Sequence, residues 1–200
     1  MPKILLMDIF GMYFGLGVNH IADFAGYDHI LFLVCLTAVY VIREWKRLLI
    51  LITAFTLGHT VSLVLATFNL VYFSTGWIEF LIPLTIFLTA LWSILEKKET
   101  VSRKGHYIKY SAALFFGLIH GLGFSFYLRS LLSTADNLAI PLLGFNLGIE
   151  AGQIIIVTVI LALSYIAHRY VRIAHREWNL ILSGAGMGIS LILMGERFPL

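Results

Sequence analysis

The chain has 200 residues, of which 60% are hydrophobic and 12% charged, with a net charge of +3 and a mean hydropathy of +0.91. Soluble domains carry roughly 25% charged residues, so this composition excludes a water-soluble globule. The single Cys35 excludes a disulfide within the chain.

The first apolar segment, residues 4–21, is long enough to cross a bilayer core of about 30 Å. It contains Asp8 and three glycines, Gly11, Gly15 and Gly17. Asp8 also interrupts the apolar stretch that a signal peptide would need. We predict a helix that lies in or dips into the outer interface, with a full span as the alternative.

Six further apolar runs approach the roughly 20 residues that span a bilayer. They cover residues 28–43, 48–70, 77–95, 108–128, 140–167 and 177–195. The sequence therefore predicts an all-α fold. It is a polytopic membrane bundle of six transmembrane helices plus the N-terminal interfacial or seventh helix, in one domain over residues 1–200.

Basic residues predict the orientation of these spans. Eleven of the fourteen Lys and Arg follow the first, third and fifth spans: Arg43, Lys46, Arg47, Lys97, Lys98, Arg103, Lys104, Lys109, Arg169, Arg172 and Arg176. By the positive-inside rule these loops face the cytoplasm, which places the C-terminus outside a bacterial-type inner membrane. The net charge therefore reports topology and does not indicate nucleic-acid binding.

Several metal-competent side chains interrupt the apolar runs, where ionisable groups are costly and usually line a site or a pathway. His20, Asp28 and His29 form a predicted outer group. His59 lies twelve residues after Arg47, and His120 lies eleven residues after Lys109. Both are therefore about 16–18 Å from the cytoplasmic face, close to the membrane centre. Glu150 lies at a similar level, so these three form a predicted central group.

Helical spacing adds polar neighbours to the central group. Asn146, Glu150 and Gln153 recur at i, i+4 and i+7, which places them on one stripe. Thr56 and Ser62 share a helix face with His59. Two sets of glycines predict close helix packing. They are Gly117, Gly121 and Gly123 around His120, and Gly184, Gly186 and Gly188 in the last span.

Neutral imidazole is the commonest metal ligand and suits nickel, cobalt, zinc and copper. A pathway needs several sites weak enough for the ion to leave, whereas a tight closed site would indicate a structural metal. Each histidine alone is explained by a hydrogen bond that joins helices. The set with Glu150 favours a function, because joining helices needs no ionisable carboxylate.

Four motifs resemble the HupE/UreJ family. They begin at Gly26, Phe55, Phe116 and Phe145 and read GYDHILFL, FTLGHT, FGLIHGLGF and FNLGIEAGQ. The resemblance implies a small polytopic membrane protein that acts as a nickel or cobalt permease. The metal-handling residues that it implies are His20, Asp28, His29 and His120. The chain departs from the family's HPxxGxDH motif at Ile21, which stands where that motif has proline, and the gap between His20 and Asp28 is two residues longer.

The first functional hypothesis is a permease that moves a divalent ion, nickel or cobalt, inward along the His, Asp and Glu side chains. The second is an intramembrane zinc-dependent hydrolase or transferase acting on lipid or amide bonds, because three histidines and an acid can hold a catalytic zinc. The third is a non-catalytic assembly protein. The bound ion (Ni, Co or Zn) and the lipid bilayer are the predicted partners. Proton coupling and a homo-oligomer stay open.

Overall fold

The structure is a computed structural model that describes residues 3–96, 103–132 and 138–199. Within these ranges the chain is helical and has no strand. The helices are α1 (Lys3–Ile21), α2 (Asp28–Thr37), α3 (Trp45–Thr67), α4 (Thr75–Leu95), α5 (Arg103–Leu132), α6 (Ala139–Ile166) and α7 (His175–Glu196). A 3₁₀ turn, Ile42–Glu44, precedes α3, and a π-helical turn, Ala167–Val171, follows α6. The all-α prediction is confirmed.

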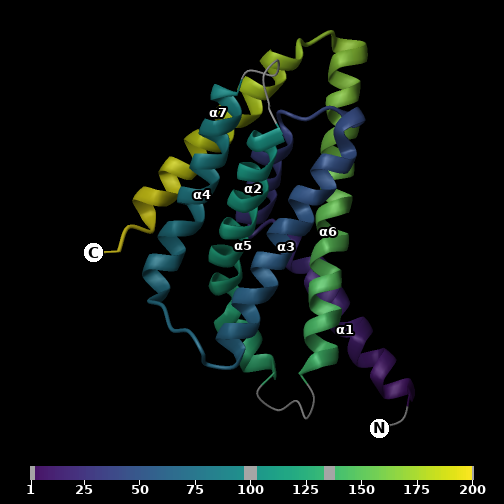
Figure 1. The fold of residues 1–200 in the computed structure, drawn as a ribbon, viewed down its shortest axis with the longest axis vertical. Coiled ribbons are helices and arrows are strands. Elements are labelled where there is room, and N and C mark those ends of the chain that lie inside the picture. Colours follow the sequence, from purple (N-terminus) through teal and green to yellow (C-terminus); the bar gives the residue numbers. More distant parts are fainter. Residues whose placement is uncertain (1–2, 97–102, 133–137, 200) are drawn as a thin grey trace.

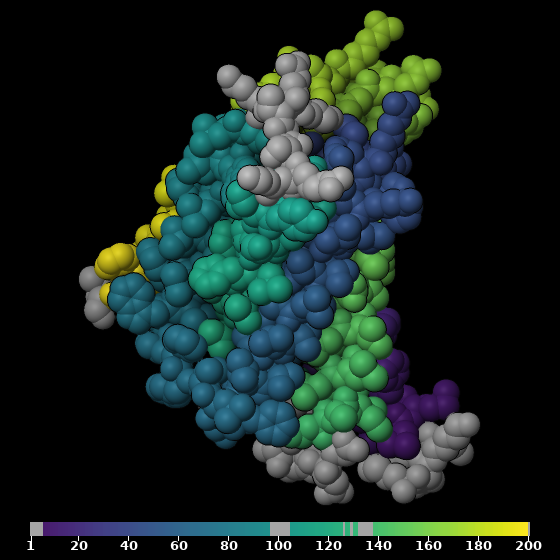
Figure 2. Space-filling model, in the orientation of Figure 1, coloured from purple at the N-terminus to yellow at the C-terminus, as the bar shows by residue number. Residues whose placement is uncertain are grey.

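Four helical segments of the described chain are long and apolar enough to cross a membrane: Ile42–Thr67, Thr75–Leu95, Ala139–Val171 and His175–Glu196. Their outer faces expose large apolar side chains, including Leu57, Ile155 and Ile192. Such exposure is typical of a helix that faces lipid, because water would penalise it. Side chains of α3, α4 and α5 close one face of the bundle (Figure 2).

α1 packs along α6 through glycines. A Cβ atom on Gly17 would overlap the carbonyl oxygen of Phe145, and one on Gly148 would overlap that of Phe14. Backbones approach this closely only where side chains are absent, as in small-residue packing between membrane helices. Gly11 and Gly15 have nothing within 4 Å of a built Cβ, so they take no part. α1 is therefore held against the bundle, and whether residues 4–21 lie in the outer interface or cross the membrane stays a prediction.

α2 follows α1 after a short turn and leads to the start of α3 (Figure 1). The side chains at the break are close, since the rings of His20 and His29 lie 4.6 Å apart. Both helices run from the N-terminal end of the bundle toward the end where α3 begins (Figure 1). The predicted span over residues 28–43 is wrong in its length, because α2 ends at Thr37 after ten residues.

α3 and α5 pack face to face. A Cβ atom on Gly58 would overlap the carbonyl oxygen of Leu114, and one on Gly117 would overlap that of Phe55. The predicted close approach around His120 is thus confirmed at Gly117. In the last span, Gly186 packs against Cys35, whereas Gly184 and Gly188 have nothing within 4 Å of a built Cβ. The glycine face predicted for this helix is therefore reduced to Gly186.

Basic side chains collect at one end of the bundle, where α3, α5 and α7 begin and α4 and α6 end (Figure 1). Arg43, Lys46 and Lys109 lie on described segments at this end, whereas Lys97 and Lys98 lie outside the described residues. Residues 198–199 reach the opposite end, where Phe198 contacts Phe80 near the start of α4. The end that holds most of the basic residues is called the basic end below.

Candidate metal centre

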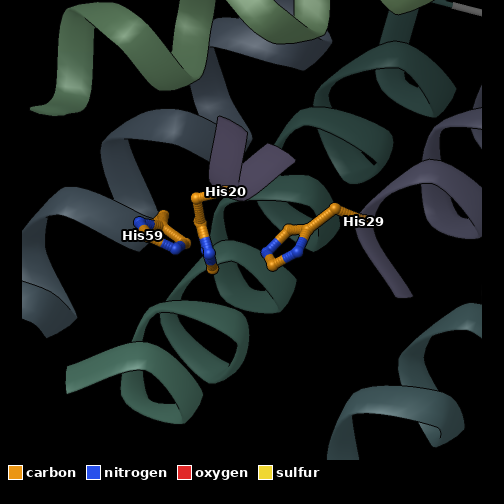
Figure 3. A group of neighbouring side chains, drawn as sticks. All are labelled: His20, His29 and His59. Carbon is orange, nitrogen blue, oxygen red and sulfur yellow. The ribbon is translucent and has the colours of Figure 1, made fainter. Parts of the chain in front are cut away.

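Three histidines from three helices converge at the break between α1 and α2. His20 ends α1, His29 lies in the first turn of α2, and His59 comes from the middle of α3. One ring nitrogen of each lies within 4.8 Å of those of the other two. Figure 3 shows the three rings turned toward one another, with His20 between His29 and His59. We call these residues the three-histidine group.

The nitrogens of this group lack protein partners. Both ring nitrogens of His59 are buried without a hydrogen bond, as are the Nε2 atoms of His20 and His29. His59 is fully buried and His29 is 8% exposed. A buried polar atom without a partner costs about 1–3 kcal/mol, so native proteins rarely keep several in one place. A bound cation would satisfy them.

The ring nitrogens are close enough to share one ion. Metal–nitrogen bonds of about 2.0–2.1 Å place neighbouring ligand nitrogens about 3–3.5 Å apart. The nitrogens of the three-histidine group lie within 4.8 Å of one another, so an ion could contact all three imidazoles after at most small side-chain rotations.

Aromatic rings surround the group. The ring of Phe124 lies 3.9 Å from that of His20 and stacks on Phe145, with centroids 5.2 Å apart. Phe55 contacts both His29 and His59 at 6.4 Å. These rings exclude water from the imidazoles and also present π faces that attract a cation.

His120 lies beside the three-histidine group. Its ring centroid is 5.2 Å from that of His29. The Thr85 hydroxyl lies 2.7 Å from the Ile82 carbonyl oxygen and shares a hydrogen bond of 2.9 Å with His120 Nε2. His120 Nδ1 is buried without a partner. A metal-binding imidazole is usually oriented in this way by a second hydrogen bond.

Asp28 is paired with a base from the far end of the chain. Arg197 Nη1 lies 3.0 Å from Asp28 Oδ2, and both side chains are partly buried. Asp28 Oδ1 is buried without a partner. The pair fixes the first turn of α2 beside the last residues of α7, and hence the position of the neighbouring His29.

Glu150 is not in the three-histidine group. It accepts a hydrogen bond of 2.7 Å from the Thr53 hydroxyl on α3. The rest of its stripe faces α3 as well, because Thr60 donates to Asn146 at 2.6 Å and Thr56 donates to Gln153 at 2.7 Å. The predicted stripe on α6 therefore exists, but it joins α6 to α3. The prediction that Glu150 converges with the histidines is not supported by this placement.

Ser62, the last of the predicted supporting polar residues, bonds to the backbone of its own helix. The Ser62 hydroxyl donates to the carbonyl oxygen of His59 at 3.0 Å.

His20, expected in the outer group with Asp28 and His29, is instead part of the three-histidine group with His59. An open depression lined by Asn19, His20 and Asp23 of the α1 end, together with Phe124 and Tyr127, reaches it from the surface.

Two residues that sequence reasoning missed support the site. Thr85 orients His120, and Arg197 neutralises Asp28. Thr85 lies in an apolar span with no histidine in its own helix, so no spacing pattern marks it. Arg197 lies 169 residues from Asp28, and only the fold brings the two together.

A family model described as HupE / UreJ protein matches residues 3–195, nearly the whole chain. No curated protein and no solved structure matches the chain. The match covers all four motifs from which the resemblance was predicted, and it confirms that prediction. It also supports metal transport as the general function.

Proposed function

The chain belongs to the HupE/UreJ family, and on this premise we propose that it carries a divalent transition-metal ion inward across the membrane through the three-histidine group. The buried imidazole nitrogens carry the proposal, because they have no protein partner. A purely structural role for these histidines would leave that cost unexplained.

The position of the group supports a pathway. Interrupted membrane helices commonly place substrate sites at their breaks, where helix ends and turns supply polar groups. Here the break between α1 and α2 supplies His20 and His29, and α3 supplies His59. The depression that contains Asn19 and Asp23 gives the ion access to His20 from the surface.

We propose a topology of six crossings with both termini outside. α1 and α2 together make the first crossing, and α3 to α7 make the other five. The basic end then faces the cytoplasm of a bacterial-type inner membrane. A divalent cation that moves inward gains about 4.6 kcal/mol per 100 mV of negative-inside potential, so the chain needs no nucleotide-driven step.

Nickel and cobalt are the proposed cargo. The three-histidine group offers imidazoles and no carboxylate, and imidazole suits late first-row divalent ions better than calcium or magnesium. His120 lies beside this group with Nδ1 buried and without a protein partner, and is the proposed ligand for the next step of the path.

A catalytic zinc site would use the same kind of ligand set, with three histidines and an open position. Two serine hydroxyls near the histidines, Ser62 and Ser125, donate to backbone carbonyl oxygens of their own helices, those of His59 and Leu122. Metal exchange separates the two functions. Cargo exchanges readily with free ions, whereas a catalytic zinc stays bound through a chelator wash.

The test is uptake of nickel and cobalt by cells that express His29→Ala or His59→Ala. We expect both variants to insert in the membrane and to lose accumulation to the level of cells without the protein. His168→Ala is the matched control, because His168 lies at the basic end after α6 and is hydrogen-bonded to His175, outside the three-histidine group. Wild-type uptake by both site variants would overturn the proposal.

A further inference from the structure

A small cavity lies between α2, α4 and α5, on the side of the histidines that faces the basic end. Its volume is about 40 Å³, enough for a few water molecules. Its lining includes Phe32, Leu36, Thr89, Glu96, Lys109 and Phe116. We call this space the inner cavity.

The inner cavity is in register with the histidine layer. Three pairs of residues, each separated by eleven positions, connect the two layers: His29 and Tyr40 after α2, Thr85 and Glu96 on α4, and His120 and Lys109 on α5. On α5, eleven residues make three helical turns and about 16 Å, so His120 and Lys109 face nearly the same direction. Tyr40 lies beyond the end of α2 and Glu96 directly follows α4, and both line the inner cavity together with Lys109.

A buried ion pair closes the far end of the inner cavity. Lys109 Nζ lies 2.6 Å from Glu96 Oε1, and the two side chains are only 11% and 8% exposed. The Tyr40 hydroxyl lies 3.5 Å from the same nitrogen. Burying an ion pair seldom adds stability, because desolvation offsets the attraction. The rest of the cavity lining is mainly apolar, so the place of this charged pair in that lining points to a function.

Aromatic side chains separate the inner cavity from the histidines. Phe32 lines the cavity, and its ring lies 5.4 Å from that of His120 and 4.7 Å from that of Phe55. Phe116 also lines the cavity and contacts Phe32 at 6.4 Å. The path is therefore closed at two levels in this structure, by rings next to His120 and by the ion pair beyond them.

We propose that the inner cavity is the inner half of the ion's route and that Glu96 is the ligand that receives the ion before its release. Lys109 holds Glu96 when no metal is there. The inference rests on the proposed function, because it assumes that an ion passes from the three-histidine group toward the basic end.

The chemistry of the exchange follows from charge. A divalent ion that reaches Glu96 brings two positive charges beside the single charge of Lys109, so the ion and the ammonium compete for one carboxylate. As the ion leaves toward the cytoplasm, Lys109 recovers Glu96 and closes the route. The step breaks and forms only ionic contacts, and it consumes no other reactant.

The first test measures access to the inner cavity. Thr89 is replaced by Cys in a Cys35→Ser background, and inside-out vesicles are treated with a membrane-impermeant thiol reagent. We expect labelling at least tenfold faster when the ion pair is replaced by the amide pair Glu96→Gln/Lys109→Gln. The matched control is Glu44→Gln/Arg47→Gln, which removes the exposed ion pair at the start of α3 and leaves labelling unchanged. Equal labelling with and without the Glu96–Lys109 pair would overturn the gate.

The second test separates binding from release. In Glu96→Gln, nickel uptake into proteoliposomes should fall about tenfold, while nickel binding by the detergent-purified protein keeps its affinity. Wild-type uptake in this variant would overturn the assignment of Glu96. If the proposed transport function is wrong, the unmodified protein itself will take up no nickel, which distinguishes that outcome from a wrong assignment of Glu96. The labelling experiment does not depend on transport, so it still tests whether the Glu96–Lys109 pair closes the inner cavity.

Discussion

The imidazoles at the α1–α2 break are buried at a cost that the protein itself does not offset. His59 has two buried nitrogens without partners, and His20 and His29 have one each. Each such atom costs about 1–3 kcal/mol, so the metal-free protein is less stable than an apolar version of the same site would be. Function and stability therefore oppose each other at these residues.

Replacing His59 by Leu tests this opposition. The substitution keeps a buried side chain of similar size and removes the unpartnered nitrogens. We expect the free energy of unfolding of the metal-free variant to equal that of the original or to exceed it by up to about 3 kcal/mol. We also expect the variant to lose metal binding. Thermal unfolding after chelation and nickel titration measure the two effects. A loss of several kcal/mol would show that His59 is a structural residue.

His120→Leu is the matched comparison, because His120 shares a hydrogen bond with Thr85 and has one unpartnered nitrogen, whereas His59 has two and no hydrogen bond. The lost hydrogen bond, about 1 kcal/mol, offsets part of the gain from removing the unpartnered nitrogen. We therefore expect His120→Leu to be less stable than His59→Leu in the metal-free state, and equal stability of the two variants would contradict this assignment.

Asp28 is expected to act as a positioning residue through Arg197. Asp28→Asn leaves Arg197 partly buried without its partner, so metal affinity should fall several-fold as the first turn of α2 shifts. Adding Arg197→Gln should restore much of the affinity, because an amide pair can rejoin α2 to the end of α7. If Asp28 instead binds the metal directly, the double variant will be no better than the single one.

Sequence reasoning found the histidines but not all of their partners. His20, His29 and His59 stood out because ionisable groups are rare in apolar spans. The spacing of Asn146, Glu150 and Gln153 placed them correctly on one stripe. Spacing gives a helix face but not the neighbour that the face meets, so Glu150 was assigned to the histidines while Thr53 is its partner.

Among the elements, the interrupted α1–α2 pair carries most of the site. Hydropathy alone could not reveal it, because residues 28–43 form a continuous apolar run that covers both α2 and the non-helical residues after it. The glycines of α1 gave a partial signal. Only Gly17 packs closely, and the decisive partners, Gly144 and Gly148, lie on α6.

The packing of α1 on α6 is tested by Gly148→Ala. The added methyl group would overlap the Phe14 carbonyl oxygen, so α1 must move and carry His20 with it. We expect a lower unfolding temperature in detergent and weaker nickel binding.

Gly188→Ala is the control for that substitution, since a built Cβ there has nothing within 4 Å. It should leave binding unchanged and keep or raise stability, by up to about 1 kcal/mol of helix propensity. Equal effects of the two substitutions would contradict the assigned packing.

For the whole molecule, the basic end and the helix order together define a topology. The distribution of Lys and Arg predicted which loops share a side, and the helix ends agree with that division among the described residues (Figure 1). The sequence predicted six crossings with residues 28–43 as the first, and the proposed topology keeps six but joins α1 to α2 in that first crossing.

The six-crossing topology is tested by reporter fusions. An alkaline phosphatase fused after residue 200 should be active, because the enzyme folds only outside the cytoplasm. A green fluorescent protein fused after residue 96 should fluoresce, because Glu96 lies at the basic end, which the proposed topology places in the cytoplasm. A fluorescent C-terminal fusion would contradict the proposed topology.

The most direct test of the metal path is an X-ray absorption measurement on purified protein loaded with one equivalent of nickel. The account predicts nitrogen ligands at about 2.0–2.1 Å with the signature of several imidazoles. It also predicts that these imidazole signals are lost in the His20→Ala, His29→Ala and His59→Ala variants. Nickel bound with unchanged imidazole coordination in all three variants would contradict the claim that these histidines form the site.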